Sequence, residues 1–496
     1  MKKKLLFLLL LASFFLSSTL SAFAAGLEGF EGGIMDDVKY TEMIFITGEP
    51  VRLEGSAKVT RGAVRNGKRQ DRITYKLESS DGTVKLSRNV TLLVTFEEGG
   101  KNSQSKVNYE VSRATETVTV KKGKTTDRYT LTHYILTASS VSDLSAAADY
   151  TTTVLRGKKV YDINSGKGTV EIEISGKGAS YGSAWGQAET RQIEYVISSY
   201  RKADSKNNVE ESSWSGTVEA RLSHSQKVEI SHEENLPAGM SFSGAYVKKI
   251  FEDASLRYDY TLPRFDANGM PLNRLKKGSE TISLSSTPKV EAGNIPEFYD
   301  IRTHWARQDV ERLTALGIIK QDGNYFWPQA PIRRLDFALA LGRLLDVASR
   351  AESLEGQSAE NDLEFDDLSL NKEEMTIVTA LSKMGVIEGT SPRRFSPDQA
   401  LTRAQVATML VRALGLEKTV PTSYRLSFKD AKDIPSWARD SVYVGSSLGL
   451  IRGDDAGYFR PNDSITRAEA AALLNRLMNY LKEDLERNFR EKVMYY

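Results

Sequence analysis

The spacing of apolar residues changes once along this 496-residue chain, near residue 290. Before that point apolar and polar residues alternate, as in TVEIEIS at 169–175, and a period of two is typical of half-buried antiparallel strands. After it, apolar residues recur every three or four positions, the spacing of amphipathic helices. The pattern predicts a multidomain chain, with an N-terminal all-β module and a C-terminal all-α module joined by a linker at 286–296. The two parts are expected to fold separately.

The β-rich module is expected over residues 26–290. Further alternating stretches at 72–77 and 192–197, with Gly-containing turns between strands, favour an antiparallel, sandwich-like arrangement. A weak similarity between two segments of this module is also compatible with two smaller sandwiches. Lysine-rich stretches at 121–124 and 156–159 are expected to solvate strand edges.

Residues 1–25 have the order of a secretory signal peptide: lysines, then an apolar run from Leu5 to Leu16, then small residues. That run is too short to span a bilayer, and no other segment reaches the roughly 20 apolar residues that a spanning helix needs. With no cysteine, the chain has no disulfide, thiolate zinc site or cysteine nucleophile. A net charge of +2 argues against nucleic acid as a partner. We therefore expect a secreted protein without a membrane span.

A frame of fixed spacing occurs three times in the helical half. A phenylalanine is followed eight positions later by an arginine, and the frame recurs after 69 and then 64 residues: Phe326 and Arg334, Phe395 and Arg403, Phe459 and Arg467. Each unit reads as a helix, a glycine stop, a loop containing Phe and Pro, and a second helix. One helix pair cannot bury its apolar face alone, so the three should pack together.

Two of the second helices begin with good caps. Thr402 with Gln405, and Thr466 with Glu469, have the spacing of a capping box. The arginine after each threonine is not explained by helix stability, because a cation in the first turn faces the positive end of the helix dipole. These arginines are therefore expected to have another role.

This arrangement resembles the S-layer homology (SLH) family, whose consensus runs F-x-D, H-W-A, G-I-I-x-G, F-x-P and I-T-R-A-E. The resemblance covers residues 296–482, with repeats at 296–346, 363–416 and 426–482 and a helical tail at 483–496. It implies an all-α SLH triplet with pseudo-threefold packing. It also implies non-covalent attachment to secondary cell-wall polysaccharide, commonly pyruvylated, in grooves between repeats.

The resemblance also assigns roles to single residues. The motif arginines would bind a glycan carboxylate in bidentate fashion, next to the N–H groups of a helix N-terminus: Arg334, Arg403 and Arg467. Tryptophans at the H-W-A position would support a sugar ring or pack in the core: Trp305 and Trp437. Aspartates at the F-x-D position would support the site or cap a helix: Asp300, Asp367 and Asp430.

The repeats depart from the consensus to different degrees. The first has Arg333-Arg334-Leu335-Asp336 at the T-R-A-E position and so lacks the threonine cap, and the second lacks the tryptophan. The third is nearly intact. The groove of Arg467 is therefore the first choice for the glycan site.

The function of the β module has to be argued separately. The chain has four histidines and contains no H-E-x-x-H, G-x-S-x-G or P-loop pattern, so no catalytic residue and no enzymatic activity are predicted. No metal or cofactor is predicted either, and calcium is left open because Asp454-Asp455 is too little for a calcium loop. We expect a cell-wall protein that displays its β module as an S-layer-like or adhesin-like component, with copies of itself as a further partner. The alternative is a wall-anchored polysaccharide-active enzyme with its site in that module.

Overall fold

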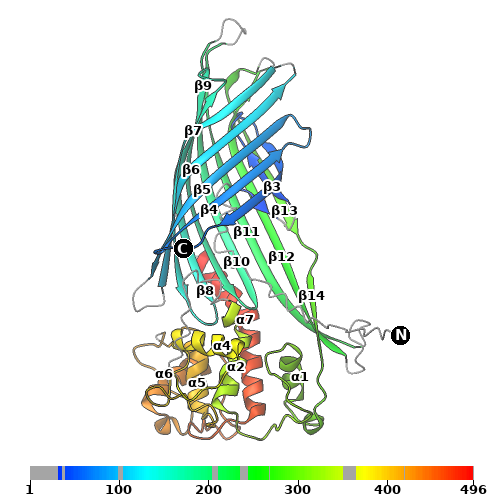
Figure 1. The fold of residues 1–496 in the computed structure, drawn as a ribbon, viewed down its shortest axis with the longest axis vertical. Coiled ribbons are helices and arrows are strands. Elements are labelled where there is room, and N and C mark those ends of the chain that lie inside the picture. The colour runs from blue at the N-terminus through cyan, green and yellow to red at the C-terminus, as the bar shows by residue number, and fades with distance from the viewer. Residues whose placement is uncertain are drawn as a thin grey trace, which may run out of the picture.

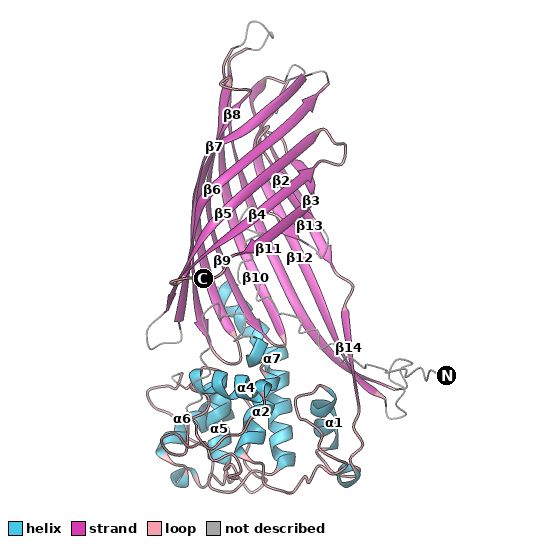
Figure 2. Ribbon diagram, in the orientation of Figure 1, coloured by secondary structure: helices cyan, strands magenta, loops and turns pink. Residues whose placement is uncertain are grey.

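The computed structural model describes residues 32–494, except 36–38, 99–103, 124, 204–209, 235–243, 267–268, 350–364 and 418. The expected signal peptide lies outside the described residues. Strands occupy the chain up to Asn294 and helices follow, so the predicted order of the two parts is confirmed (Figures 1 and 2).

The described strands form one antiparallel sheet in which neighbours in sequence are neighbours in space, from β1 to β13, and β14 pairs with β12. The strands are β1 (Ile34–Met35), β2 (Tyr40–Ile44), β3 (Val51–Arg61), β4 (Lys68–Glu78), β5 (Val84–Glu98), β6 (Gln104–Lys122), β7 (Thr125–Leu144), β8 (Asp149–Ile163), β9 (Gly168–Ser183), β10 (Gly186–Arg201), β11 (Ser212–Glu233), β12 (Ala245–Phe265), β13 (Pro271–Ser285) and β14 (Lys289–Asn294).

The sheet curls so that its two halves face each other across one core (Figure 1). In β4, for example, Ile73, Tyr75 and Leu77 are buried while the residues between them face outward, as the period of two predicts. The curl brings β2 beside β12, where the Met43 N–H donates to Tyr258 Oη at 3.2 Å. The antiparallel all-β prediction is confirmed. The sandwich-like packing arises from a single sheet, and no division into two sandwiches is seen among the described strands.

The prediction of a linker at 286–296 is partly wrong. Residues 289–294 form β14, whose Ala292 lies opposite Val247 of β12. At this end of β12 the backbone N–H and C=O groups of one edge pair with β11, and pairing with β14 satisfies those of the other edge.

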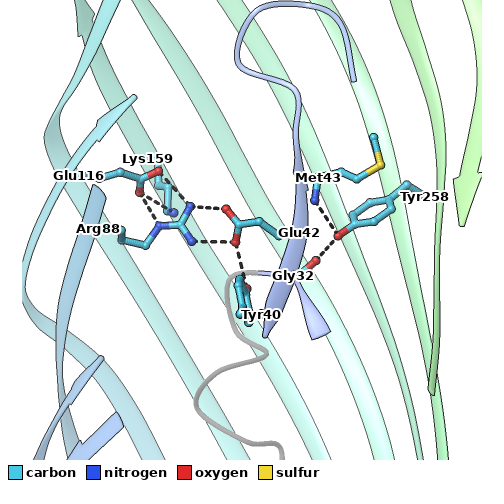
Figure 3. A network of polar contacts seen from close by, with 8 residues as sticks. All are labelled: Gly32, Tyr40, Glu42, Met43, Arg88, Glu116, Lys159 and Tyr258. Carbon is cyan, nitrogen blue, oxygen red and sulfur yellow. Dashed lines mark hydrogen bonds and ion pairs between the residues drawn. The ribbon is translucent and has the colours of Figure 1, made fainter. Parts of the chain in front are cut away.

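A buried ionic network crosses the interior of the curled sheet (Figure 3). Arg88 of β5 donates to Glu42 of β2 at 2.9 and 3.0 Å and to Glu116 of β6 at 2.9 and 3.0 Å. Lys159 of β8 donates to Glu116 at 3.2 Å, and Tyr40 Oη donates to Glu42 at 2.9 Å. The charged side chains are at most 6% exposed. The network ties β2 to three other strands through the core.

The expectation that the lysines at 156–159 solvate a strand edge is wrong for Lys159. Its position in β8 faces the interior, whereas its neighbour Lys158 faces outward and pairs with Glu171. Sequence composition cannot separate the two, because only the alternation of the folded strand decides which lysine is buried. Lys121 and Lys122 are exposed, as expected.

The second part of the chain is helical. Its helices are η2 (Tyr299–Ile301), α1 (Arg307–Ala315), α2 (Arg334–Leu344), α4 (Lys372–Lys383), α5 (Arg403–Ala413), η3 (Ala431–Asp433), α6 (Ser436–Ser447) and α7 (Arg467–Met494). The expected C-terminal tail is a continuation of α7 as far as Met494. Within the described part of the chain, no helix has the length and apolar character needed to cross a membrane.

The helices pack in a consistent order. The second helix of each repeat contacts the first helix of another, in the pairs α2 with α4, α5 with α6, and α7 with α1. The glycine stops act as expected: Gly317, Gly385 and Gly449 follow α1, α4 and α6 with φ of 72°, 68° and 70°, a conformation that suits glycine.

The two parts meet in a buried junction. The Ala147 N–H in the β7–β8 turn donates to the Ala413 carbonyl at the end of α5, and Trp185 Nε1 in the β9–β10 turn donates to the Leu344 carbonyl at the end of α2, each at 2.8 Å. α7 packs against β9 and β10, and one hydrophobic cluster includes residues from both parts. The C-terminal ends of α2 and α5 therefore face the sheet, and their N-terminal ends point away from it (Figure 1).

Candidate functional site

The three motif arginines link the repeats into a ring. Each is the first residue of its helix, and each guanidinium lies over the phenylalanine ring of another repeat. The distances from guanidinium carbon to ring centroid are 4.9 Å for Arg334 and Phe395, 5.4 Å for Arg403 and Phe459, and 4.8 Å for Arg467 and Phe326. The third contact returns to the first repeat, so the ring is closed.

Backbone hydrogen bonds close the same ring. The residues two positions before the arginines are buried, and the backbone N–H of each donates to the carbonyl of another. The bonds run from Ile332 to Ile465 at 3.0 Å, from Ile465 to Leu401 at 3.0 Å, and from Leu401 to Ile332 at 3.2 Å. The N-termini of α2, α5 and α7 therefore meet at one end of the helical part. This end faces away from the β module.

The arginines differ in how many of their donors are already used. Arg403 donates to the carbonyls of Phe459 and Arg452, and its Nη1 lies 3.3 Å from Glu469. Arg334 is buried and donates to the Glu388 carbonyl, while its Nε has no hydrogen-bond partner among the described residues.

The Arg467 side chain is more accessible to solvent than that of Arg403. Its Nε donates to the Phe326 carbonyl at 2.7 Å, and its Nη1 lies 3.5 Å from Asp336. Its side chain is 26% exposed, compared with 19% for Arg403. Burial lowers the pKa of the Arg467 guanidinium, and the charge of Asp336 opposes that shift. The geometry leaves part of the Arg467 guanidinium open to a ligand.

The helix caps have the expected geometry in two repeats. Thr402 and Gln405 exchange hydrogen bonds of 3.3 and 3.0 Å, and Thr466 and Glu469 exchange bonds of 3.2 and 2.8 Å. In the first repeat the cap position holds Arg333, which makes no cap hydrogen bond. These contacts order the turn from which each arginine projects.

The three F-x-D aspartates hold the Phe-Pro loops. Each carboxylate accepts two backbone N–H groups from the loop of its own repeat, at 2.7 to 2.9 Å: Asp300 from Phe326 and Trp327, Asp367 from Phe395 and Ser396, and Asp430 from Phe459 and Arg460. The second donor in each loop has φ between 57° and 61°. For Asp367, burial alone would raise the carboxyl pKa, but the two N–H donors lower it below its ordinary value. The aspartates thus position the phenylalanine on which the next arginine lies.

Replacing Asp430 with alanine is expected to destabilise the helical part by about 2 kcal/mol, because the buried N–H of Phe459 and the partly buried N–H of Arg460 lose a charged acceptor. Thermal melts followed by circular dichroism measure the change. Asp366→Ala is the matched control, because Asp366 is exposed and its side chain pairs with exposed Arg393. Equal melting of the two variants would contradict the loop-holding role.

Trp305 and Trp437 both lie on the surface. More than half of each residue is exposed, so neither packs in the core. Both are therefore open to contact with a ligand, and Trp305 lies against the ring of His304.

Sequence reasoning missed an aromatic cluster beside Arg467. Trp327 is 64% exposed and stacks on Tyr325 with ring centroids 5.5 Å apart, and Tyr299 packs edge-on against Tyr325 at 5.7 Å. We call these three residues the Trp327 platform. Trp327 directly follows Phe326, on which Arg467 lies. A signal was present in the sequence, because the equivalent positions of the other repeats hold Ser396 and Arg460.

Metal ligation has no support in the described ranges. No group of three or more His, Cys, Asp or Glu residues is placed there to hold a metal ion. Asp454, considered above for calcium, accepts the Tyr458 N–H at 2.9 Å and pairs with Arg460 at 2.7 Å. Its carboxylate thus stabilises a turn.

The family model of the S-layer homology domain matches residues 297–338, 364–407 and 427–471. These matches coincide with the three helix pairs that the arginines connect. The expected resemblance is therefore confirmed.

Similar curated proteins include both enzymes and surface-layer proteins. An endoglucanase of Bacillus sp. (strain KSM-635) is 36% identical over 129 residues, covering 26% of this chain and 13% of the relative. Exoglucanase XynX of Acetivibrio thermocellus is 27% identical over 40% of this chain and 18% of the relative.

The surface-layer 125 kDa protein of Lysinibacillus sphaericus is 28% identical over 39% of this chain and 16% of the relative. The chain thus spans less than a fifth of the length of each of these three relatives. The matched domains and the surface-layer relatives together establish that this chain carries three S-layer homology domains and is a secreted cell-surface protein.

Proposed function

We propose that the SLH domains anchor the protein non-covalently to cell-wall polysaccharide and that the β module is displayed from this anchor. The observation that carries the proposal is the coincidence of the three family matches with the closed ring of arginine contacts. The ring places three helix N-termini at the end of the molecule that faces away from the β module. Binding at this end would leave the β module free.

A more specific proposal concerns the glycan-binding site within the SLH domains. The three repeats pack with pseudo-threefold symmetry, and the groove of Arg467 binds a carboxylate-bearing glycan such as a pyruvylated terminal sugar. A guanidinium suits a carboxylate because two parallel N–H bonds can form. The Trp327 platform offers exposed ring faces beside it for the apolar face of a sugar. Charge and stacking would thus act on the same glycan terminus.

Replacing Arg467 with alanine is expected to weaken binding to purified wall polysaccharide about tenfold or more, through loss of a charge-assisted hydrogen bond worth roughly 1.5 to 3 kcal/mol. The loss of binding is measured by pull-down on wall fragments, at a temperature well below the melting temperature of each variant. Thr466→Ala should instead cost about 1 kcal/mol of stability with a smaller effect on binding.

Arg403→Ala is the matched control. Arg403 has the same position in its repeat and the same stacking on a phenylalanine, but its donors are used within the protein. Arg403→Ala should lose its own stacking contact and keep binding. If all arginine variants bound like the wild type, the arginines would be scaffold only. A loss confined to Arg334→Ala or Arg403→Ala would move the site to another groove.

For the β module we propose a non-enzymatic role in an S-layer-like or adhesin-like coat, with copies of the same chain as partners. The second candidate is a wall-anchored polysaccharide-active enzyme, which the glucanase relatives leave open. An assay of the secreted protein for cleavage of a glycan panel separates the two. Released products would overturn the non-enzymatic proposal.

A further inference from the structure

A groove of about 670 Å³ opens at the end of the β module that lies farthest from the helices. The β9–β10 turn contains Trp185 and touches α2, so the opposite ends of these two strands are distal to the anchor (Figure 1). The groove lies there, and its volume falls in the range of ligand sites, about 300 to 1,000 Å³. In an anchored molecule it would face away from the wall.

The floor of the groove is formed by the outer face of three neighbouring strands. Ile197 of β10 faces the core, so Ser198 and Tyr200 of the same strand face outward. Tyr200 lies opposite Thr169 of β9 and Ser213 of β11. Ser198 lies opposite Glu171 and Ser215, and these six residues line the groove in two adjacent rows: Thr169, Tyr200, Ser213, Glu171, Ser198 and Ser215.

One side of the groove is formed by an irregularity in the edge strand β13. Pro263 of β12 lies opposite Leu275 of β13, but the next residue, Arg264, lies opposite Leu272. Asn273 and Arg274 are therefore extra residues in β13 and are held out of the regular pairing. Both line the groove together with the exposed Leu272 and Leu275. The bulge thus turns a flat sheet edge into one side of a concave site.

The chemistry of the lining selects for a neutral polar ligand. Serine and threonine hydroxyls can each donate and accept hydrogen bonds, as sugar hydroxyls do. The exposed ring of Tyr200 and the leucines of β13 offer apolar surface, and the Tyr200 hydroxyl is oriented by Glu211 at 3.1 Å. Among the residues that the structure describes, the lining contains one cation, Arg274, and one anion, Glu171, whose charges cancel, so this lining has no net charge to attract a polyanion.

We propose that this groove is a second glycan-binding site, specific for a neutral oligosaccharide. It goes beyond wall anchoring and does not depend on it, because it uses different residues at the opposite end of the molecule. The displayed module would thus bind an external neutral glycan while the SLH domains bind the wall.

The secreted protein is screened on an array of neutral oligosaccharides, with cellohexaose and maltohexaose as soluble probes for titration calorimetry. At least one neutral glycan is expected to bind. Ser215→Trp should block the groove, and Tyr200→Ala should remove its aromatic surface, each weakening affinity at least tenfold. Both positions face solvent or the groove, so both variants should keep the wild-type melting temperature.

Val196→Ala is the matched control, because Val196 is exposed on the same face of β10 but does not line the groove. It should bind like the wild type, and so should Arg467→Ala, which separates this site from the anchor. Absence of neutral glycan binding, or equal affinity in Ser215→Trp and wild type, would overturn the proposal. Displacement by a strand-forming peptide alone would assign the groove to peptides instead.

Discussion

Replacing Arg88 with methionine is expected to destabilise the β module by about 3 to 5 kcal/mol, the usual cost of removing one partner from a buried ion pair. Arg88 is the cation shared by Glu42 and Glu116 in the core. Without it, Glu116 keeps Lys159, but Glu42 loses the guanidinium that balances its buried charge and keeps the hydrogen bond from Tyr40 Oη. Chemical denaturation followed by the β signal in circular dichroism measures the change.

Two controls make this result specific. Lys106→Ala breaks an exposed pair with Glu97 and should cost less than about 1 kcal/mol. The double variant Arg88→Met with Glu42→Gln removes both charges and leaves Glu116 balanced by Lys159, so it should recover part of the lost stability. A single Arg88→Met variant as stable as the wild type would show that the network does not hold β2 in the core.

The same network predicts a dependence on acid. Burial alone would raise the pKa of Glu116, but Arg88 and Lys159 outweigh it and lower the pKa to about 2 from an ordinary 4.5. A lowered carboxyl pKa stabilises the folded state above the unfolded pKa, and this contribution is lost as the pH falls from 4.5 towards 2. Denaturation at several pH values should show this loss in the wild type and a smaller one in Glu116→Gln.

Replacing Trp185 with alanine is expected to uncouple the two parts of the protein. The indole is buried at the junction, donates to the Leu344 carbonyl at 2.8 Å and lies under the ammonium of Lys248. Truncating a buried tryptophan costs about 3 to 5 kcal/mol. Scanning calorimetry should show one cooperative transition in the wild type and two separated transitions in the variant.

Trp437→Ala is the control, because it removes the same side chain from an exposed position and should change stability by no more than about 0.5 kcal/mol. A single unchanged transition in Trp185→Ala would show that the junction carries little energy. Separate folding of the two halves, expected from the change of apolar spacing, stays a prediction. The junction means that each isolated half would expose apolar surface that the intact chain buries.

Features that depend on short stretches of chain could be predicted from the sequence. The capping box of Thr402 and Gln405 and the glycine stop at Gly385 involve residues close together in the chain, so their spacing encodes their contacts. The same holds for the strand alternation in β4. The threefold frame placed Arg403 and Arg467 at helix N-termini for the same reason.

Contacts between distant segments could not be predicted in this way. The partner of each motif arginine is a phenylalanine in another repeat, and nothing local to Arg467 indicates Phe326. The Trp327 platform likewise depends on how Tyr299 and Tyr325 are brought together.

Periodicity and short-range hydrogen bonds are properties of neighbouring residues, so the all-β and all-α character of the two parts, the three SLH repeats and their caps could be predicted from the sequence alone. Three features became visible in the folded chain alone: one sheet curls around a single core, Lys159 is buried while Lys158 is not, and the turns of the sheet meet the ends of α2 and α5. The physical reason is that burial and charge pairing depend on which distant surfaces meet, and many sequences with the same local pattern could meet differently.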